Sequence, residues 1–244
     1  MKRIGILLTG NIRTISACTP SLKSFLSNCN ADIFVGTYNL QYGYHPWVAQ
    51  STGFISDEIL SREQIVSMLN PIKPRDIIVD DHSEYVKKMS AFIGKAFLPH
   101  EYGSLMQFFK MNDVLSSIKN YETENGFKYD ALIKTRCDLS YLGQAPIDRL
   151  FGDEIVVDTG NVFPNDCVLL GSRNSMVKVI ETMAALCRTI DDRNSYATKD
   201  IPHGLLHMAV TNAKMNFVEM PLIKSVVRWN KEVSYPPCFS ELRK

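Results

Sequence analysis

The 244-residue sequence predicts an α/β fold in which a mainly parallel sheet is covered by helices on both faces. Three observations support this prediction. Apolar runs of strand length alternate along the chain with longer stretches of helical periodicity. Connections of helical length suit parallel strands, whereas antiparallel strands can be joined by a short turn. No linker, repeat or low-complexity tract interrupts the alternation, so we expect residues 1–244 to form one single domain.

The amino-terminal half is expected to consist of βα units. Residues 3–8 form a continuous apolar strand, and a polar turn at residues 9–14 leads into a helix that extends to about Ser27. A loop rich in Tyr, Gly and Trp occupies residues 39–53. The other elements expected in this half are strands at 31–38 and 76–79 and helices at 57–69, 82–97 and 104–125.

The second half of the chain continues the same rhythm. Apolar and polar residues alternate from Tyr129 onwards, after an Asn-Gly turn, which predicts a strand of about six residues that ends near Lys134. The later elements are strands at 154–157, at 167–170 and near Phe217, with helices at 174–190 and 202–213. This order predicts a Rossmann-like α/β fold.

Composition excludes several classes of partner. The formal net charge of +1 and the absence of any Lys/Arg cluster longer than Lys87-Lys88 argue against nucleic acid as a ligand. The six cysteines lack metal-type or redox-type spacing, and the sequence opens on a strand rather than on a secretory signal. No apolar run is long enough for a transmembrane segment. We therefore expect a soluble, cytoplasmic protein, of undetermined oligomeric state.

The turn after the first strand is a candidate nucleotide-binding segment. Thr9, Gly10 and Asn11 lie between a strand and a helix, where backbone N–H groups and the helix dipole favour phosphate. Arg13 follows, and its guanidinium suits bidentate contact with a phosphate or carboxylate. The GxGxxG and GxxxxGK[ST] patterns are both absent. The alternative is a plain βα turn in which Gly10 supplies a positive φ.

A charged cluster follows the strand at 129–134. Lys134, Arg136 and Asp138 lie at its carboxyl end, and ligands of open α/β sheets bind beyond the carboxyl ends of the strands. The alternative is a salt bridge that closes a loop. Aromatic residues crowd the loop after the second strand and are suited either to stacking on a base or sugar or to a small satellite core: Tyr38, Tyr42, Tyr44, His45 and Trp47.

Several of these segments together form an ordered series. It comprises Leu-Thr-Gly-Asn-Ile-Arg-Thr, Asp-Ile-Phe-Val-Gly-Thr-Tyr-Asn, Gln107 on the long helix, Tyr-Asp-Ala-Leu-Ile-Lys-Thr-Arg-Cys-Asp-Leu, and the segment 165–176. The series spans most of the chain and resembles glycosyltransferase-like proteins of the WavE lipopolysaccharide-synthesis kind and related bacterial and large-virus sugar transferases. The resemblance implies a GT-A fold, an αβα sandwich that binds a nucleotide-sugar.

In that fold a DxD motif holds a divalent metal against the diphosphate of the donor. Here Arg136 stands where the first Asp would be, which leaves Asp138 as the only carboxylate of the motif. The resemblance thus predicts Mn²⁺ or Mg²⁺ bound through Asp138, together with phosphate oxygens and water. The alternative is that Arg136 and Lys134 neutralise the leaving diphosphate in place of the metal.

A transferase that inverts the sugar's anomeric configuration also needs a base for the acceptor hydroxyl, whereas a retaining enzyme can use the donor phosphate. Asp166 is the first candidate, with an Asx turn as the alternative role. Asp158 is the second candidate and is more typical of a turn residue. His203 is a third residue near the acceptor side, although a lone His at a helix start more often caps the helix or faces solvent.

We therefore expect a glycosyltransferase that moves a sugar from a nucleotide-sugar donor to a hydroxyl of a glycan or glycolipid acceptor. Thr9, Gly10, Asn11 and Arg13 would hold the nucleotide. A second hypothesis is a noncatalytic nucleotide- or sugar-binding module derived from a transferase. A nucleotidyltransferase is less well supported, because the sequence lacks a Gly-rich loop with basic residues that would hold a triphosphate.

Overall fold

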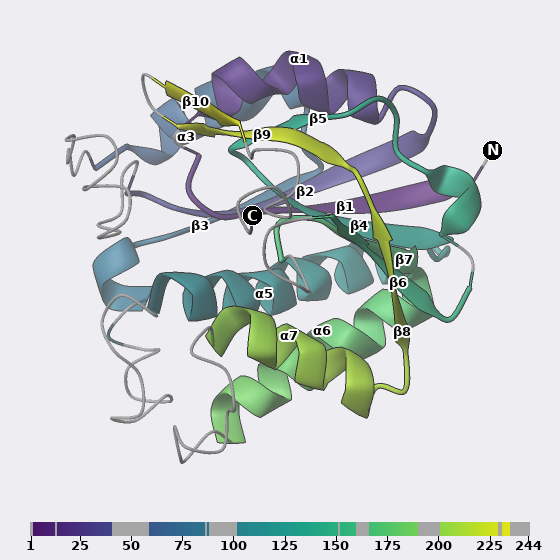
Figure 1. The fold of residues 1–244 in the computed structure, drawn as a ribbon. Coiled ribbons are helices and arrows are strands. Elements are labelled where there is room, and N and C mark those ends of the chain that lie inside the picture. The colour runs from purple at the N-terminus through teal and green to yellow at the C-terminus, as the bar shows by residue number, and fades with distance from the viewer. Residues whose placement is uncertain are drawn as a thin grey trace, which may run out of the picture.

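Seven strands form the central sheet of the computed structural model, which describes residues 2–12, 14–40, 59–85, 87, 102–150, 152–159, 166–189, 201–228 and 231–234. In spatial order these strands are β3 (Asp76–Asp80), β2 (Asn30–Tyr38), β1 (Arg3–Thr9), β4 (Ala131–Arg136), β7 (Leu169–Ser172), β6 (Glu154–Asp158) and β8 (Asn216–Met220). In this order β1 and β4 lie near the middle of the sheet, and each has a neighbouring strand on both sides that shields its edges from water (Figure 1).

The sheet is mainly parallel, as the sequence predicts. Strands β3, β2, β1 and β4 pair in parallel, and so do β6 and β8. Strand β7 alone of the seven is antiparallel to both of its neighbours, β4 and β6. The connection from β6 to β7 covers only residues 159–168, which is shorter than the helical crossover that a parallel pair would need.

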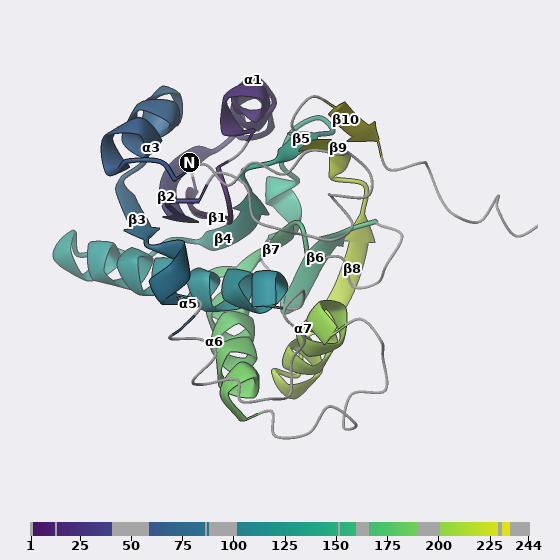
Figure 2. The same cartoon turned by 90° about the vertical axis from the view of Figure 1, so that its left-hand side faces the viewer.

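Helices cover both faces of this sheet. Helices α5 (Tyr102–Glu124), α6 (Arg173–Thr189) and α7 (Ile201–Asn212) pack on one face, and α1 (Ile15–Phe25) and α3 (Arg62–Leu69) pack on the other (Figures 1 and 2). In β1, Leu7 belongs to the core under α5, whereas Ile6 and Leu8 belong to the core under α1. Burial on both faces explains the continuous apolar run of this strand. The Rossmann-like αβα sandwich is therefore confirmed.

A second, three-stranded sheet lies on the α1 side and was not predicted. Its antiparallel strands, in the order β10 (Lys231–Ser234), β9 (Ile223–Arg228) and β5 (Leu139–Tyr141), lie beside α1 in Figure 2. The Tyr141 ring stacks on Phe25 of α1 with 4.5 Å between ring centroids. The Tyr141 N–H also donates to the Ser21 hydroxyl at 2.7 Å. Strand β5 follows β4 after only two residues, so the chain leaves the main sheet at once.

Several boundaries differ from the predicted ones. Strand β4 begins at Ala131 instead of Tyr129 and continues to Arg136, so Lys134 lies inside the strand. The predicted strand at 167–170 is shifted to Leu169–Ser172. Helix α3 begins at Arg62 rather than at 57, because Ser61 and Gln64 form a capping box there. Two short 3₁₀ turns, η1 (Asn70–Ile72) and η3 (Ile147–Arg149), complete the described elements.

Some predicted features lie outside the described residues. The predicted helix at 82–97 is described only at residues 82–85 and 87, where it is helical. Most of the aromatic loop after β2 also falls outside, including Tyr42, Tyr44, His45 and Trp47. Among the described helices, none combines the length and the apolar character that spanning a membrane requires.

Candidate functional site

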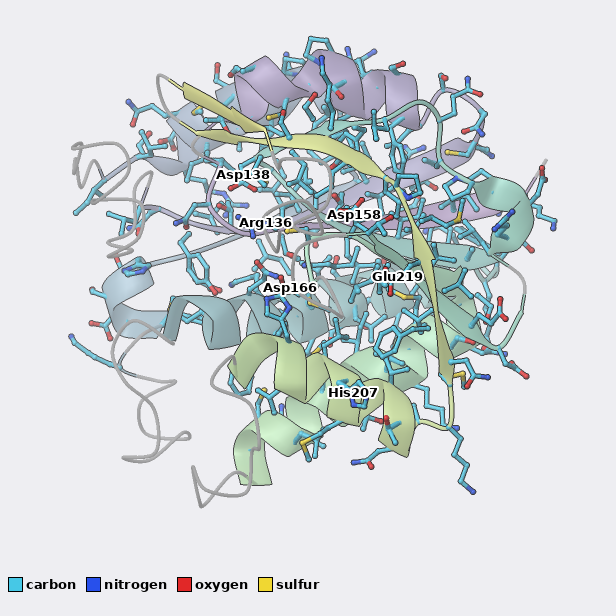
Figure 3. The ribbon with its side chains drawn as sticks, viewed as in Figure 1. Arg136, Asp138, Asp158, Asp166, His207 and Glu219 are labelled. Carbon is cyan, nitrogen blue, oxygen red and sulfur yellow. The ribbon has the colours of Figure 1, made fainter. Side chains whose placement is uncertain are left out.

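Polar side chains gather at the sheet edge where β1, β4 and β6 end and β7 begins. Arg136 is the last residue of β4, and Asp158 is the last residue of β6. Asp166 precedes β7, whose residue Leu169 is paired with Lys134. In the view of Figure 3, Asp138, Arg136 and Asp166 lie one below another above helix α5. This is the edge at which the sequence predicts ligand binding.

Arg136 and Asp138 form a bidentate ion pair. Nε of Arg136 donates to Oδ1 of Asp138 at 2.9 Å, and Nη2 donates to Oδ2 at 2.8 Å. The Asp138 side chain is only 3% exposed, and the Arg136 side chain is 18% exposed. Burial opposes the charge of Arg136, but the Asp138 carboxylate outweighs it and holds the pKa of Arg136 well above its usual value. The alternative of a salt bridge closing the turn after β4 is thus what the structure shows.

Lys134 lies deeper, on the face covered by α5. Its strand partner in β1 is Leu7, a member of the core under that helix. The ammonium is fully buried and donates to the backbone carbonyl of Asp166. Burial lowers the pKa of Lys134 to about 8, despite the opposing attraction of Asp166. Lys134 therefore ties β4 to the segment that carries Asp166.

Asp166 keeps one carboxylate oxygen available. Its Oδ2 accepts from the Gln107 amide of α5 at 3.0 Å, and its Oδ1 accepts no hydrogen bond from the described part of the chain. Burial raises the pKa of this carboxyl, but the Lys134 and Arg136 charges, with His203 and Gln107, lower it to below the usual value. Asp166 is thus held ionised, with one oxygen still able to accept a hydrogen bond.

The β1–α1 turn has two polar side chains without partners in the described part of the chain. The Thr9 hydroxyl is fully buried and has no hydrogen-bond partner there, and the half-buried Asn11 amide makes none either. Thr9 is the register partner of Arg136, and both residues share the face of Leu7 and Lys134 by strand alternation. Gly10 has a φ of 109°, as the alternative reading of this turn predicts. Its N–H donates to the carbonyl of Gly36 at 3.1 Å and is therefore not directed at a ligand.

A buried lysine on α5 was not recognised in the sequence. Lys110 is fully buried, and its ammonium forms a salt bridge with Asp80 at the end of β3 and lies over the rings of Tyr38 and Tyr85, 4.8 and 4.4 Å from their centroids. Its stem passes over Gly36, where a Cβ would stand 2.8 Å from Lys110 atoms. The signal in the sequence was a lysine between two apolar residues, Phe109 and Met111, of the helix expected at 104–125.

The remaining candidates have varied surroundings. Oδ1 of Asp158 accepts from the N–H groups of Leu222 and Ile223, at 2.7 and 2.9 Å, and so holds the turn between β8 and β9. Burial raises the pKa of Asp158 in spite of these bonds. His203 is half-buried at the start of α7 and interacts electrostatically with Asp166. Tyr38 is buried and donates to the Met106 carbonyl at 2.9 Å, which gives it a packing role. Arg13 lies outside the described residues.

The described residues do not fit a metal held by the protein at Asp138. Both oxygens of this carboxylate accept hydrogen bonds from Arg136, so a cation would meet a guanidinium where it needs oxygen ligands. Across the described ranges, no group of three His, Cys, Asp or Glu side chains stands close enough to hold a metal ion. The Mn²⁺ or Mg²⁺ predicted at Asp138 therefore does not fit the contacts that this carboxylate makes.

Comparisons with known proteins add little to this geometry. No family model matches the chain, and no curated protein matches it. A solved structure described as a "putative nucleotide-diphospho-sugar transferase" from Desulfovibrio desulfuricans G20 is similar, with a TM-score of 0.45 and 9% identity, covering 91% of this chain and 80% of that chain. So remote a likeness carries no argument about activity, and membership of the WavE-type family stays a prediction.

Proposed function

We propose that this protein transfers a sugar from a nucleotide-diphosphate donor to the hydroxyl of a glycan or glycolipid acceptor. One observation carries the proposal. Hydrogen-bond donors without partners in the described chain, on Thr9, Asn11 and Arg136, lie at the same sheet edge as Asp166, which has an oxygen without such a partner. Donors in this arrangement suit the oxygens of a diphosphate, and the carboxylate suits an acceptor hydroxyl.

The roles follow from the chemistry of each group. The Thr9 hydroxyl, the Asn11 amide and Arg136 would bind donor phosphate oxygens and stabilise the charge that grows on the leaving diphosphate. Asp166 would accept the proton of the acceptor hydroxyl through Oδ1, while Gln107 holds Oδ2 at 3.0 Å. The bond from the anomeric carbon to phosphate oxygen breaks, the bond to the acceptor oxygen forms, and the nucleoside diphosphate leaves with the electron pair.

Thermal unfolding with a panel of UDP-, GDP-, CMP- and dTDP-sugars, with and without Mn²⁺, tests the binding step. A ligand that binds only the native state raises the melting temperature, so we expect one of the UDP-, GDP- or dTDP-sugars to do so selectively, and the CMP-sugar, whose leaving group is a monophosphate, to leave it unchanged. Slow release of free nucleotide from that donor in water then tests the catalytic step, because many transferases use water in place of an absent acceptor. An unchanged melting temperature with every nucleotide would refute the proposal.

A noncatalytic binding module is a second candidate, favoured by the Arg136–Asp138 pair. Arg136 pairs with Asp138, the only carboxylate of the expected metal motif. A transferase that has lost its catalytic activity would show this kind of change at the motif. A module of this kind would show the thermal shift without nucleotide release. The variant Asp166→Asn separates the two functions further, since it should abolish release from an enzyme and leave binding by either protein within a few-fold.

A further inference from the structure

We infer that the transfer site works without a divalent metal, and that Arg136 and Thr9 together supply the charge stabilisation that a metal would give to the leaving diphosphate. The inference rests on the proposed function and concerns how the same site handles its donor. It starts from the disagreement between the metal motif that the resemblance implies and the contacts that the structure shows at Asp138.

Asp138 offers no oxygen to a cation that is not already hydrogen-bonded to Arg136. Both of its oxygens accept hydrogen bonds from Arg136, and the side chain is 3% exposed. The pair spans only one intervening residue, so the two side chains reach each other within a single turn of the chain. A metal at Asp138 would have to displace the guanidinium while remaining next to its positive charge. The closeness of Arg136 therefore disfavours a divalent ion at this carboxylate.

Arg136 keeps N–H donors that a ligand could use. A guanidinium has five N–H donors. Asp138 takes two of them, and the thiol of Cys167 takes a third, at 3.7 Å from Nη1. Two donors, one on Nη1 and one on Nη2, therefore lack partners in the described part of the chain. Asp138 fixes the orientation of the guanidinium, because a bidentate pair allows only one relative plane. Arg136 is thus a preoriented cation with donors left for an oxyanion.

The Thr9 hydroxyl lies on the strand next to Arg136. Thr9 and Arg136 are register partners on adjacent parallel strands, and they project to the same face. The Thr9 hydroxyl is fully buried and has no partner among the described residues. Burying an unpaired hydroxyl costs free energy, so its position beside Arg136 points to a ligand oxygen that completes it. An Arg and a hydroxyl that donate side by side match two oxygens of one phosphate group.

The charges inside the cluster are consistent with this division of roles. Asp166 is neutralised largely by the buried Lys134, and Asp138 is neutralised by Arg136. Neither carboxylate therefore needs an added cation to offset its charge. The sugar leaves phosphate oxygen for the acceptor oxygen, and the electron pair that stays on the diphosphate is stabilised by the N–H groups of Arg136 and the O–H group of Thr9.

The test is calorimetric titration of the protein with UDP, GDP, CDP and dTDP. Each titration is done in EDTA and again in about 1 mM Mn²⁺, a concentration about tenfold above that of the protein, for the wild type and three variants. Free Mn²⁺ in the same samples is followed by electron paramagnetic resonance. The variants are Arg136→Lys, which keeps the charge but loses the fork; Thr9→Val, which keeps the shape but loses the hydroxyl; and Lys119→Ala on the exposed surface of α5 as a control.

We expect one nucleotide to bind in EDTA with a dissociation constant within about twofold of that in Mn²⁺, and the protein alone to take up no Mn²⁺. Arg136→Lys and Thr9→Val should each weaken this binding about tenfold or more, and Lys119→Ala should leave it unchanged. Binding that requires Mn²⁺ and survives Arg136→Lys would overturn the inference and leave the proposed function standing. An absence of nucleotide binding in both conditions would refute the proposed function, and the inference with it.

Discussion

The guanidinium of Arg136 and the carboxylate of Asp138 meet through two parallel hydrogen bonds where β4 leaves the main sheet. A second pair of the same kind stands elsewhere in the fold, where Arg173 donates twice to Glu122 at 2.6 Å. The exposed fractions are alike, 18% and 3% for the first pair and 15% and 4% for the second. The two pairs therefore allow a structural ion pair to be separated from one that also serves ligand binding.

The variant Asp138→Ala should destabilise the protein by about 3 kcal/mol, because it leaves Arg136 as a largely buried charge without its partner. Glu122→Ala should cost at least as much, since Glu122 also accepts the N–H of Tyr129 at 3.0 Å. Urea unfolding followed by circular dichroism measures both changes. Only Asp138→Ala should also weaken nucleotide binding, because it releases the orientation of Arg136. Equal binding losses in the two variants would instead indicate a general loss of structure.

The variant Thr9→Val should leave the free energy of unfolding unchanged or raise it by about 1 kcal/mol, because it removes a buried hydroxyl that has no partner in the described chain. Thr37 on the adjacent strand is the matched control. Its hydroxyl is equally buried but donates to the Tyr38 carbonyl at 3.4 Å, so Thr37→Val should cost about 1 kcal/mol. Denaturant titration compares the two variants. A loss of stability in Thr9→Val like that in Thr37→Val would show that the Thr9 hydroxyl is satisfied in the free protein.

The main sheet was predictable because a strand buried on both faces, such as β1, has a nearly continuous apolar sequence. The small second sheet was not predictable from the sequence. Strand β5 has three residues and follows β4 after only two residues, so that the two strands form one continuous sequence pattern. The reversal at β7 did leave a signal in the short connection after β6, because residues 159–168 cannot hold a crossover helix.

The candidate site was predictable only in part. Arg136 and Asp138 stand out because a strand end alone does not require charge, but the sequence left their pairing open. The partners from α5 carried a weaker signal. Gln107 entered only through the family resemblance, and Lys110 was not singled out, because periodicity does not show which side chains a buried helix turns toward the sheet edge. Their contacts with Asp166 and Asp80 arise from tertiary packing.

The variant Gly36→Ala should destabilise the protein by about 1–3 kcal/mol through overpacking. A Cβ at this position would stand 2.4 Å from Cγ2 of Val114 and 2.8 Å from the stem of Lys110, so α5 would have to move away from β2. Gly152→Ala is the control, because its Cβ would meet nothing closer than 3.9 Å. Thermal unfolding gives both values. Adding Val114→Ala to Gly36→Ala should restore part of the loss, and an absence of any rescue would argue against this contact as the cause.

The variant Lys134→Met should change how stability depends on pH. Burial lowers the pKa of Lys134 to about 8 in the folded state, whereas an unfolded lysine has a pKa of about 10.4. Between these two pKa values the unfolded chain binds more protons than the native state, so Lys134 makes the free energy of unfolding rise with pH. Below pH 8 the buried ammonium is charged and its full destabilisation of the native state is present. The difference in unfolding free energy, variant minus wild type, should therefore fall by about 1–2 kcal/mol between pH 7 and pH 9.5.

The difference between the two proteins isolates Lys134, because the buried thiols and tyrosines that titrate in the same range are common to both. Burial raises the pKa of Cys167 to about 11 and that of Cys187 to about 12, and these groups alone would make stability fall with rising pH. Urea unfolding at half-unit steps of pH gives the measurement. A difference that stays flat across this range would mean that Lys134 keeps an ordinary pKa in the folded protein, with water or an anion reaching its ammonium.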